Sequence, residues 1–412
     1  MHPEEQRTDR PLRVLILTKL FPHAANQNYA AFNRQQFVAL SQLCEVHILG
    51  LIPWFPGARL FSKKSEAGQW SSVPARETID GLDVHHPRAF FFPRFGHAAN
   101  PLTFALSLLP AVLPLKRKVD VILGSWAYPD GLAAILLGRW LNLPVAVKVH
   151  GSDLNSLPDR DSIRRVLSRK LPQADRLVAV SRSLATKARE FGVAADRIAL
   201  VPNGVNRALF HPADRAEARR ELQLPDGPLL LFVGRVEASK GVLDLLQAFE
   251  SIAARSPAVR LAVVGNGTEI PLCRKAQSRW PDRIFLPGPQ PLAQVARWIA
   301  ACDVLTLPSW NEGSPNVIRE AMASGRRVVA TRVGGIPDLL DSALAGEMVS
   351  ARRPDELAEA LWRAANTTYD PQRIASAGPV DWQESARLLR LALLSTCNGS
   401  PLPMELRADA GP

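Results

Sequence analysis

Short apolar runs recur along the first half of the chain, and segments with helical spacing separate several of them. The runs lie at residues 12–17, 46–49, 84–86, 121–123, 145–149, 177–180 and 198–201. Residues 31–43, 132–141 and 163–171 repeat apolar side chains at the spacing of a helix. Continuous apolar strands that alternate with helices indicate a parallel sheet covered on both faces. The pattern therefore predicts an α/β fold built on a doubly wound parallel sheet.

A second series of apolar runs begins after a polar break near Asn206. A polar helix is expected at 214–222, and further runs follow at 229–233, 261–264, 304–307 and 328–330. Because 412 residues exceed one ordinary core, we expect two domains, 1–206 and 207–380. Residues 381–397 have the apolar stripe of one more helix, and residues 398–412 are expected to form a disordered tail.

Composition narrows the environment in which this chain is expected to work. Its four cysteines are widely scattered, with no C-x-x-C and no histidine at metal-binding spacing. This usage indicates a reduced cytoplasmic compartment without disulfides or a zinc site. The first 13 residues lack the apolar segment of a signal peptide, and we expect no stretch apolar enough to span a membrane.

Positive charge is concentrated in the first half of the chain. Residues 1–185 hold 23 Lys and Arg against 14 Asp and Glu, within a total net charge of +11. Nucleic acid, an acidic membrane surface and a phosphorylated acceptor are all partners that fit such a charge. Residues 90–118 add an apolar segment with a basic end, which is either an amphipathic patch resting on a membrane or a helix packed on the sheet.

The stretch at 310–325, WNEGSPNVIREAMASG, places Glu312 and Glu320 eight residues apart across a junction between a loop and a helix. Pro315 fits a helix start, so the open amides of Asn316 and Val317 lie between the two acids. Open amides at a helix start bind anions, and flanking acids accept hydroxyl groups. The stretch therefore fits a nucleotide sugar. The alternative makes both glutamates solvated surface acids.

Two cations follow the first strand of the second series. Gly234 and Arg235 come directly after residues 229–233, and Lys240 precedes a long helix that starts at Val242. We expect the two cations and the helix amides to converge on a departing diphosphate, to which each charge-assisted hydrogen bond contributes roughly 1.5–3 kcal/mol. Either cation alone would also fit an ordinary surface turn.

Polar residues in the first half follow strands at the edge where parallel sheets bind ligands. His150, Ser152 and Asp153 come after the run at 145–149, and Asp130 lies between a strand and a helix. Asp130 is either an acid that orients an acceptor hydroxyl or a first-turn acid that stabilises its helix. Asn203 lies in the turn that closes the first domain.

The 310–325 stretch resembles the E-x7-E motif of retaining glycosyltransferases of family 4. The residues that match are Glu312, Gly313, Pro315, Asn316, Val317, Glu320, Ala321, Met322 and Ala323. HGSD at 150–153 and PNGV at 202–205 are similar to further motifs of that family, and the resemblance covers nearly the whole chain. One departure is Ala30, which stands where similar enzymes usually carry a glycine, so its methyl group is expected to restrict the approach of a phosphate or acceptor.

The resemblance implies a GT-B fold, with two Rossmann-like domains facing a cleft and helix 381–397 returning to the first domain. It implies a retaining transferase that moves a hexose from a nucleotide-diphosphate sugar to a glycan or polyprenyl-linked acceptor, in exopolysaccharide or other surface-glycan assembly. No metal or other cofactor and no nucleic acid are expected, and the place of action would be cytoplasmic, peripheral to the inner face of the plasma membrane.

The resemblance also assigns roles to individual residues. The catalytic residues would be Glu312, His150, Arg235 and Lys240. The donor site would comprise Gly234, Arg235, Lys240, Gly265, Gly267, Gly288, Glu312, Gly313, Pro315, Asn316, Val317 and Glu320. The acceptor or sugar side would comprise Asp130, Ser152, Asp153 and Asn203.

Other readings of the sequence stay open at this point. A nucleotide-sugar epimerase or a phosphorylase would use a similar site. A nucleic-acid-binding protein would explain the charge, although no reading motif is present. A catalytically inactive scaffold that binds a glycan or nucleotide would keep the donor residues without turning the donor over.

Overall fold

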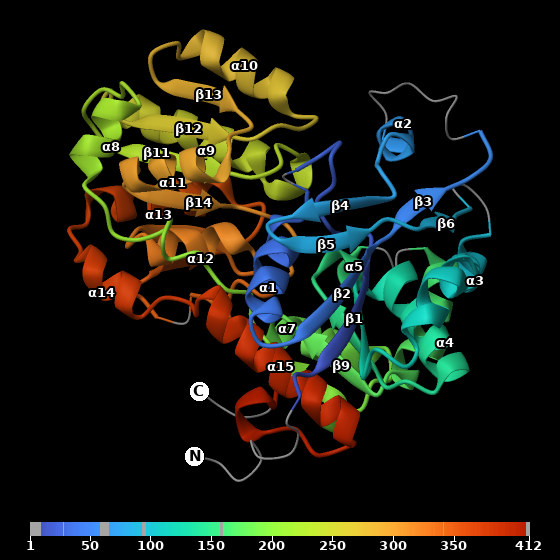
Figure 1. Cartoon of the computed structure of the whole chain (residues 1–412). Helices are drawn as coiled ribbons and strands as arrows, with labels where there is room; N and C mark the ends of the chain where they lie inside the picture. The colour runs from blue at the N-terminus through green and yellow to red at the C-terminus, as the bar shows by residue number, and fades with distance from the viewer. Residues whose placement is uncertain are drawn as a thin grey trace. The chain divides into compact units, whose positions relative to one another are not determined.

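The computed structural model describes residues 10–27, 29–57, 66–92, 96–156, 160–340 and 342–408 (Figure 1). The fold divides into two compact units, residues 1–203 with 382–412 and residues 204–381. Each unit is built around a largely parallel sheet covered by helices, which confirms the predicted α/β class.

Unit 1 contains an eight-stranded sheet. Its strands, in spatial order, are β10 (Ile198–Leu200), β9 (Arg176–Ala179), β8 (Val145–Val149), β7 (Val121–Ser125), β1 (Arg13–Thr18), β2 (Glu45–Gly50), β5 (Leu82–His85) and β4 (Arg76–Ile79). All neighbouring pairs are parallel except β4 with β5. A separate parallel pair joins β3 (Ile52–Trp54) to β6 (Arg88–Phe90).

Helices cover both faces of the unit 1 sheet, which explains why its strands read as continuous apolar runs. Leu15 and Leu17 of β1 face one buried cluster, whereas Val14 and Ile16 face the other. The first cluster includes residues of α3 (Asn100–Val112) and α4 (Leu132–Leu141), and the second includes residues of α1 (Ala31–Ser41) and α15 (Trp382–Asn398). The remaining helices of the unit are α2 (Glu66–Ser71), α5 (Ser152–Asn155), α6 (Asp161–Lys170) and α7 (Arg182–Glu190).

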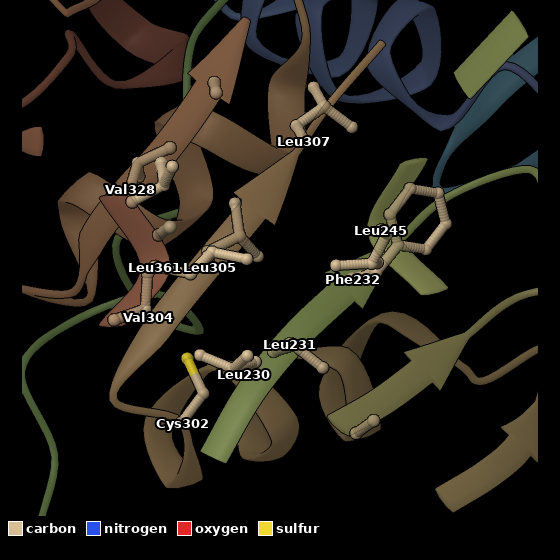
Figure 2. Close-up of a cluster of buried hydrophobic side chains, with 14 of the residues drawn as sticks. Leu230, Leu231, Phe232, Leu245, Cys302, Val304, Leu305, Leu307, Val328 and Leu361 are labelled. Carbon is tan, nitrogen blue, oxygen red and sulfur yellow. The ribbon is translucent and has the colours of Figure 1, made fainter. Parts of the chain in front are cut away.

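Unit 2 contains a six-stranded parallel sheet with one continuous core. Its strands, in spatial order, are β13 (Ile284–Gly288), β12 (Arg260–Val264), β11 (Leu229–Val233), β14 (Val304–Leu307), β15 (Arg327–Thr331) and β16 (Gly346–Val349). Figure 2 shows side chains of β11, β14 and β15 within this core. The helices of the unit are α8 (Arg215–Glu221), α9 (Val242–Arg255), α10 (Ile270–Arg279), α11 (Leu292–Ala301), α12 (Asn316–Ala323), α13 (Pro354–Asn366) and α14 (Pro371–Ser376). Because all six strands run the same way, the loops that follow them gather at one edge, where ligands of such sheets bind.

The expected disordered tail is wrong for residues 399–408, which pack on unit 1. Leu402 is 4% exposed and Leu406 is fully buried. The buried Arg176 of β9 donates a hydrogen bond to the carbonyl of Ser400 (2.8 Å). The segment packs on unit 1 because burying its two leucines stabilises the folded chain, although the rest of the segment is largely polar.

The expectation that no stretch is apolar enough to span a membrane is also wrong. The described run His97–Leu115 is long and apolar enough by length and composition, and a third of it is buried. Pro101 and Pro114 each lie in the first turn of a helix, where a missing amide costs little, whereas Pro110 lies inside α3.

Candidate functional site

Lys240 and Glu312 form an ion pair at the loop-bearing edge of the unit 2 sheet. Lys240 ends the 3₁₀ turn before α9, and Glu312 lies in the loop after β14. The Lys240 Nζ lies 2.6 Å from Glu312 Oε1, which also accepts a hydrogen bond from Ser309 Oγ (2.8 Å). Their side chains are only 19% and 10% exposed. Two residues predicted for the site thus meet in a partly desolvated environment, where charge interacts more strongly than in water.

The loop that carries Glu312 is fixed by Trp310, whose part the sequence analysis missed. The indole Nε1 of Trp310 donates to Asp244 Oδ2 of α9 (2.7 Å), and its backbone amide donates to the carbonyl of Ser239 (2.8 Å). The guanidinium of Arg352 lies 4.4 Å from the ring centroid. Trp310 therefore ties the loop after β14 to the turn that carries Lys240.

Two glycines allow the backbones around this pair to approach closely. Gly241 has φ +70°, and a Cβ there would lie 1.9 Å from the carbonyl oxygen of Pro308. Gly334 has φ +54°, and a Cβ there would lie 1.7 Å from the carbonyl oxygen of Glu312. Neither position accepts a side chain. The positions of Lys240 and Glu312 thus depend on two glycines that were not among the residues expected in the donor site.

Arg235 does not join the pair, which corrects the expectation that both cations converge. Its side chain is 70% exposed, and Nη1 bonds Glu237 Oε1 at 3.0 Å. The physical reason is local, because Glu237 lies two residues away and offers a carboxylate at the surface. Lys240 alone meets the expectation.

Glu320 lies on α12, where its carboxyl group is partly buried. This burial raises the pKa of Glu320 to about 7. Among the described residues, none donates a hydrogen bond to this carboxylate. The arrangement disagrees with the alternative in which Glu320 is a solvated surface acid.

The start of α12 has the features that the sequence predicted. The helix begins at Asn316, followed by Val317, and Pro315 precedes them in an extended conformation with no side-chain cap. The neighbouring Arg319, which the sequence analysis did not single out, is 4% exposed and donates from Nη2 to Ser314 Oγ (2.8 Å). Burial lowers the pKa of Arg319 to about 10. Arg319 thereby holds the segment that contains Gly313 and leads into the helix.

Glycines follow three neighbouring strands of the same edge. The amide of Gly234 donates to the carbonyl of Val264, and the amide of Gly265 donates to the carbonyl of Gly288, both at 3.0 Å. A Cβ on Gly265 would lie 1.9 Å from the carbonyl oxygen of Gly234, and one on Gly267 would lie 2.3 Å from that of Val236. The loops after β11, β12 and β13 therefore stack directly on one another, which leaves a backbone-lined surface beside the Lys240 turn.

His150 lies at the carboxyl end of β8 in unit 1, at the end of a chain of hydrogen bonds. Asn33 donates from Nδ2 to the carbonyl of Leu20, Ser125 Oγ donates to Asn33 Oδ1, and Ser125 Oγ lies 2.9 Å from His150 Nε2. Nε2 therefore shares a hydrogen bond with Ser125, whereas Nδ1 has no partner among the described residues. Burial and the nearby charge of Lys148 hold the pKa of His150 well below its usual value, so the ring is neutral.

Aromatic rings surround this imidazole. Phe32 lies 5.0 Å from it, and Trp126 stacks at 6.1 Å, both between ring centroids. Lys19 Nζ lies 5.8 Å from the centroid of the Trp126 ring. Sequence reasoning missed Lys19, Ser125 and Trp126, although each lies at the end of an apolar run where a ligand contact is expected.

The weaker acceptor-side predictions separate into different environments. Asp153 is fully buried and accepts hydrogen bonds from the amides of Ala127, His150 and Gly151, so it orients the loop and has no surface for a ligand. Asn203 is 4% exposed and accepts from Lys148 Nζ (3.5 Å), whereas Ser152 is exposed. For Asp153 the expectation of a ligand contact is therefore wrong, because backbone amides occupy its carboxylate.

Asp130 is fully buried and lies beside the loop after β1. Its Oδ2 accepts a hydrogen bond from the Lys19 amide (2.6 Å), and its Oδ1 has no partner in the described structure. Burial, partly offset by Lys19, raises the pKa of Asp130 to about 6. One carboxyl oxygen thus remains without a hydrogen bond, which favours the acid that orients an acceptor hydroxyl over the acid that only stabilises its helix.

Ala30 occupies a backbone conformation that favours glycine. It precedes α1 with φ 47° and ψ 45°, in the left-handed region. We predict that Ala30→Gly raises the free energy of unfolding by about 1 kcal/mol, because it removes the clash between the methyl group and the backbone. Urea unfolding measures this change. Ala39→Gly, in a right-handed turn of the same helix, is the control and should lower stability by about 1 kcal/mol or more; a loss of stability in both variants would contradict the prediction.

Two family models match the chain. "Glycosyl transferases group 1" covers residues 227–367, and "Glycosyltransferase Family 4" covers residues 39–209. A D-inositol 3-phosphate glycosyltransferase from Thermobispora bispora is 35% identical over 338 residues, which are 74% of this chain and 77% of the relative. A putative teichuronic acid biosynthesis glycosyltransferase, TuaC from Bacillus subtilis, is 27% identical over 363 residues, 85% and 89% of the two chains.

Solved structures share the fold of both units. Sucrose-phosphate synthase from Thermosynechococcus elongatus superimposes with a TM-score of 0.68 at 21% identity, covering 95% of this chain and 97% of the other. HepE from Anabaena, solved in complex with UDP-glucose, gives a TM-score of 0.62 at 18% identity over 95% and 98%. At these identities the likeness establishes the fold.

Proposed function

The chain belongs to glycosyltransferase family 4 and has the GT-B fold, and on this basis we propose that it transfers a hexose from a nucleotide-diphosphate sugar with retention of configuration. That it is a glycosyltransferase follows from the family. The donor class is supported by the Lys240–Glu312 pair together with the partly buried Glu320. The HepE structures, which were solved in complex with UDP and UDP-glucose, favour uridine as the base.

In the proposed donor site, different residues at the loop-bearing edge of the unit 2 sheet bind different parts of the nucleotide sugar. Lys240 and the amides of Asn316 and Val317 would neutralise the diphosphate, and Arg235 would leave Glu237 to join them. Glu320 would accept hydrogen bonds from the ribose hydroxyls, and Glu312 from hydroxyls of the sugar. Among the described residues, no group of three His, Cys, Asp or Glu side chains is placed to hold a metal ion. The proposed roles assign the phosphate charge to cations and amides.

The proposed transfer occurs on the face of the sugar from which the diphosphate departs. The bond between the anomeric carbon and the diphosphate oxygen breaks, the bond to the acceptor oxygen forms, and the acceptor proton passes to the departing phosphate. In unit 1, neutral His150 would form a hydrogen bond with a sugar hydroxyl through Nδ1, which has no partner in the described structure. A covalent glycosyl-enzyme trapped with a fluorinated donor would contradict this step.

The acceptor we propose is a glycan or polyprenyl-linked glycan of surface polysaccharide synthesis. The name of the TuaC relative, which refers to teichuronic acid biosynthesis, supports it. Such an acceptor would place the enzyme on the inner face of the plasma membrane. A second candidate is a small phosphorylated polyol, because the 35% identical relative from Thermobispora bispora is named for inositol 3-phosphate and the Lys19 amide bonds the buried Asp130.

The donor prediction is tested by thermal unfolding with UDP, GDP, ADP and their hexose conjugates. A ligand that binds the native state at 100 times its Kd adds about 2.7 kcal/mol, so one base should raise Tm by several degrees and the others should not. NMR of the product would then give the anomeric configuration. An epimerised donor without an acceptor, or binding without turnover of any acceptor class, would contradict the transferase proposal.

A further inference from the structure

Helix α3 carries apolar side chains on two opposite faces. Phe104, Ala105, Leu108 and Val112 are fully buried. On the other side Leu102 and Leu106, together with Leu113 directly after the last residue of α3, are 45%, 52% and 53% exposed, at spacings of four and seven residues that align them along the helix. We call this exposed stripe the α3 face. Because the core is already filled by the first set, the second set is available for a partner.

Hydrogen bonds to β6 and to Phe92, which follows it, hold α3 on unit 1. Ser107 Oγ accepts from the amide of Phe90 (3.1 Å), and Thr103 Oγ1 donates to the carbonyl of Phe90 (2.7 Å). The fully buried Asn100 accepts from the amide of Phe92 (2.8 Å). Removing the helix would leave these groups unpaired. The helix therefore lies on the outside of unit 1, next to α4 and β6 (Figure 1).

Aromatic side chains extend the apolar surface beyond the helix. Phe92 and Trp54 are 37% and 41% exposed, and Phe90 lies between them, with ring centroids 5.0 Å and 6.2 Å away. Trp54 belongs to β3 and Phe90 to its partner strand β6. Exposed aromatic rings beside leucines are typical of surfaces that meet the interface of a membrane.

Exposed cations stand at both ends of the α3 face. Lys116, Arg117 and Lys118 follow the helix directly. At its start, Arg160 Nη1 lies 3.1 Å from His97 Nε2, and the following helix α6 exposes Arg164, Arg165 and Arg169. Acids near these cations include Asp161 in the first turn of α6, Asp120, which pairs with Arg10 and Arg13, and Glu190, which lies near Arg164 and pairs with Lys187. The charge along the face is therefore strongly positive.

We propose that the α3 face docks on a membrane surface rich in anionic lipids, with the helix axis in the plane of the bilayer. Leucines and aromatic rings would enter the boundary between headgroups and acyl chains, and the cations at both ends would contact lipid phosphates. A second copy of the chain fits less well, because two-fold pairing of the helices would bring the cationic start of one beside the cationic end of the other. The inference goes beyond the transferase activity and does not depend on it.

Flotation of the full chain with vesicles tests the proposal. We expect binding to vesicles that contain phosphatidylglycerol, no binding to phosphatidylcholine alone, and weaker binding as salt is raised. Lys116→Gln/Arg117→Gln/Lys118→Gln should weaken binding by about 10- to 100-fold, and Leu102→Ser/Leu106→Ser/Leu113→Ser by at least about tenfold. Helix α10 of unit 2 supplies matched controls, because Leu272, Arg274 and Lys275 are exposed there. Leu272→Ser and Arg274→Gln/Lys275→Gln should bind like the wild type.

Several results would overturn the proposal. The first is failure of the wild type to float with anionic vesicles at low salt. The second is a loss of binding in the α10 controls that equals the loss in the α3 face variants. A third is sedimentation equilibrium in which the leucine variant converts a dimer to a monomer while vesicle binding is unchanged. Because the substituted residues are exposed, the variants should keep the Tm of the wild type, and this measurement separates lost docking from lost folding.

Discussion

Lys240→Gln is expected to lower kcat for sugar transfer by about 10²–10³-fold. The departing diphosphate gains negative charge as its bond to the sugar breaks, and a fixed ammonium in a partly desolvated site stabilises that charge more than it stabilises the bound donor. Lys240 has this position, with its side chain 19% exposed and its Nζ 2.6 Å from Glu312. Steady-state kinetics with the donor and acceptor found by screening would measure the loss.

The control for this substitution is Lys275→Gln on the exposed face of α10, which should keep full activity. Lys240→Gln also leaves Glu312 without its cation, so stability should fall together with activity. The double variant Lys240→Gln/Glu312→Gln separates the two effects, because it removes both charges and should recover much of the stability but none of the turnover. Activity of Lys240→Gln within a factor of about three of the wild type would contradict the role of Lys240, since that is less than 1 kcal/mol in the barrier.

The sequence predicted the residues of the donor edge better than their orientations. Lys240 and Glu312 were placed at one sheet edge because each follows a buried strand, and the parallel sheet brings them together. The direction of Arg235 was beyond sequence reasoning, because a surface arginine follows whichever carboxylate lies in reach, here Glu237. The spacing of apolar residues in α12 likewise gave no sign that Arg319 is buried in the helix.

In unit 1 the sequence did not reveal whether each polar side chain bonds a ligand or the backbone. Asp153 lies at a ligand-binding edge, as its position after a strand predicted, yet the turn directs three backbone amides onto its carboxylate. The two faces of α3 present a similar limit. A helix with apolar residues on two opposite faces shows no periodicity that would identify its buried face, and only the packing shows that Leu102 and Leu106 face outward.

Glu320→Gln is expected to change donor binding and the stability of the free protein in opposite directions. The pKa of Glu320 is about 7, raised by burial above its value in the unfolded chain. The protonated form therefore stabilises the native state below about pH 4.5, and this contribution is lost as pH rises through 7. At pH 8 the free Glu320→Gln protein should unfold at a temperature about 2–4 °C higher than the wild type, and the difference should vanish near pH 5.

Donor binding should follow the ionised carboxylate, because only that form accepts hydrogen bonds from both ribose hydroxyls. Between pH 6 and pH 8 the wild type should bind the intact nucleotide sugar about tenfold more tightly as Glu320 ionises, whereas Glu320→Gln should show a flat profile and weaker binding at pH 8. Calorimetry with the sugar conjugate measures this, because its diphosphate does not titrate in the range. A wild-type profile that is flat, or a Gln variant that keeps the pH dependence, would mean that another group controls donor binding. In that case ionised Glu320 would destabilise the free protein without strengthening the binding of the ribose.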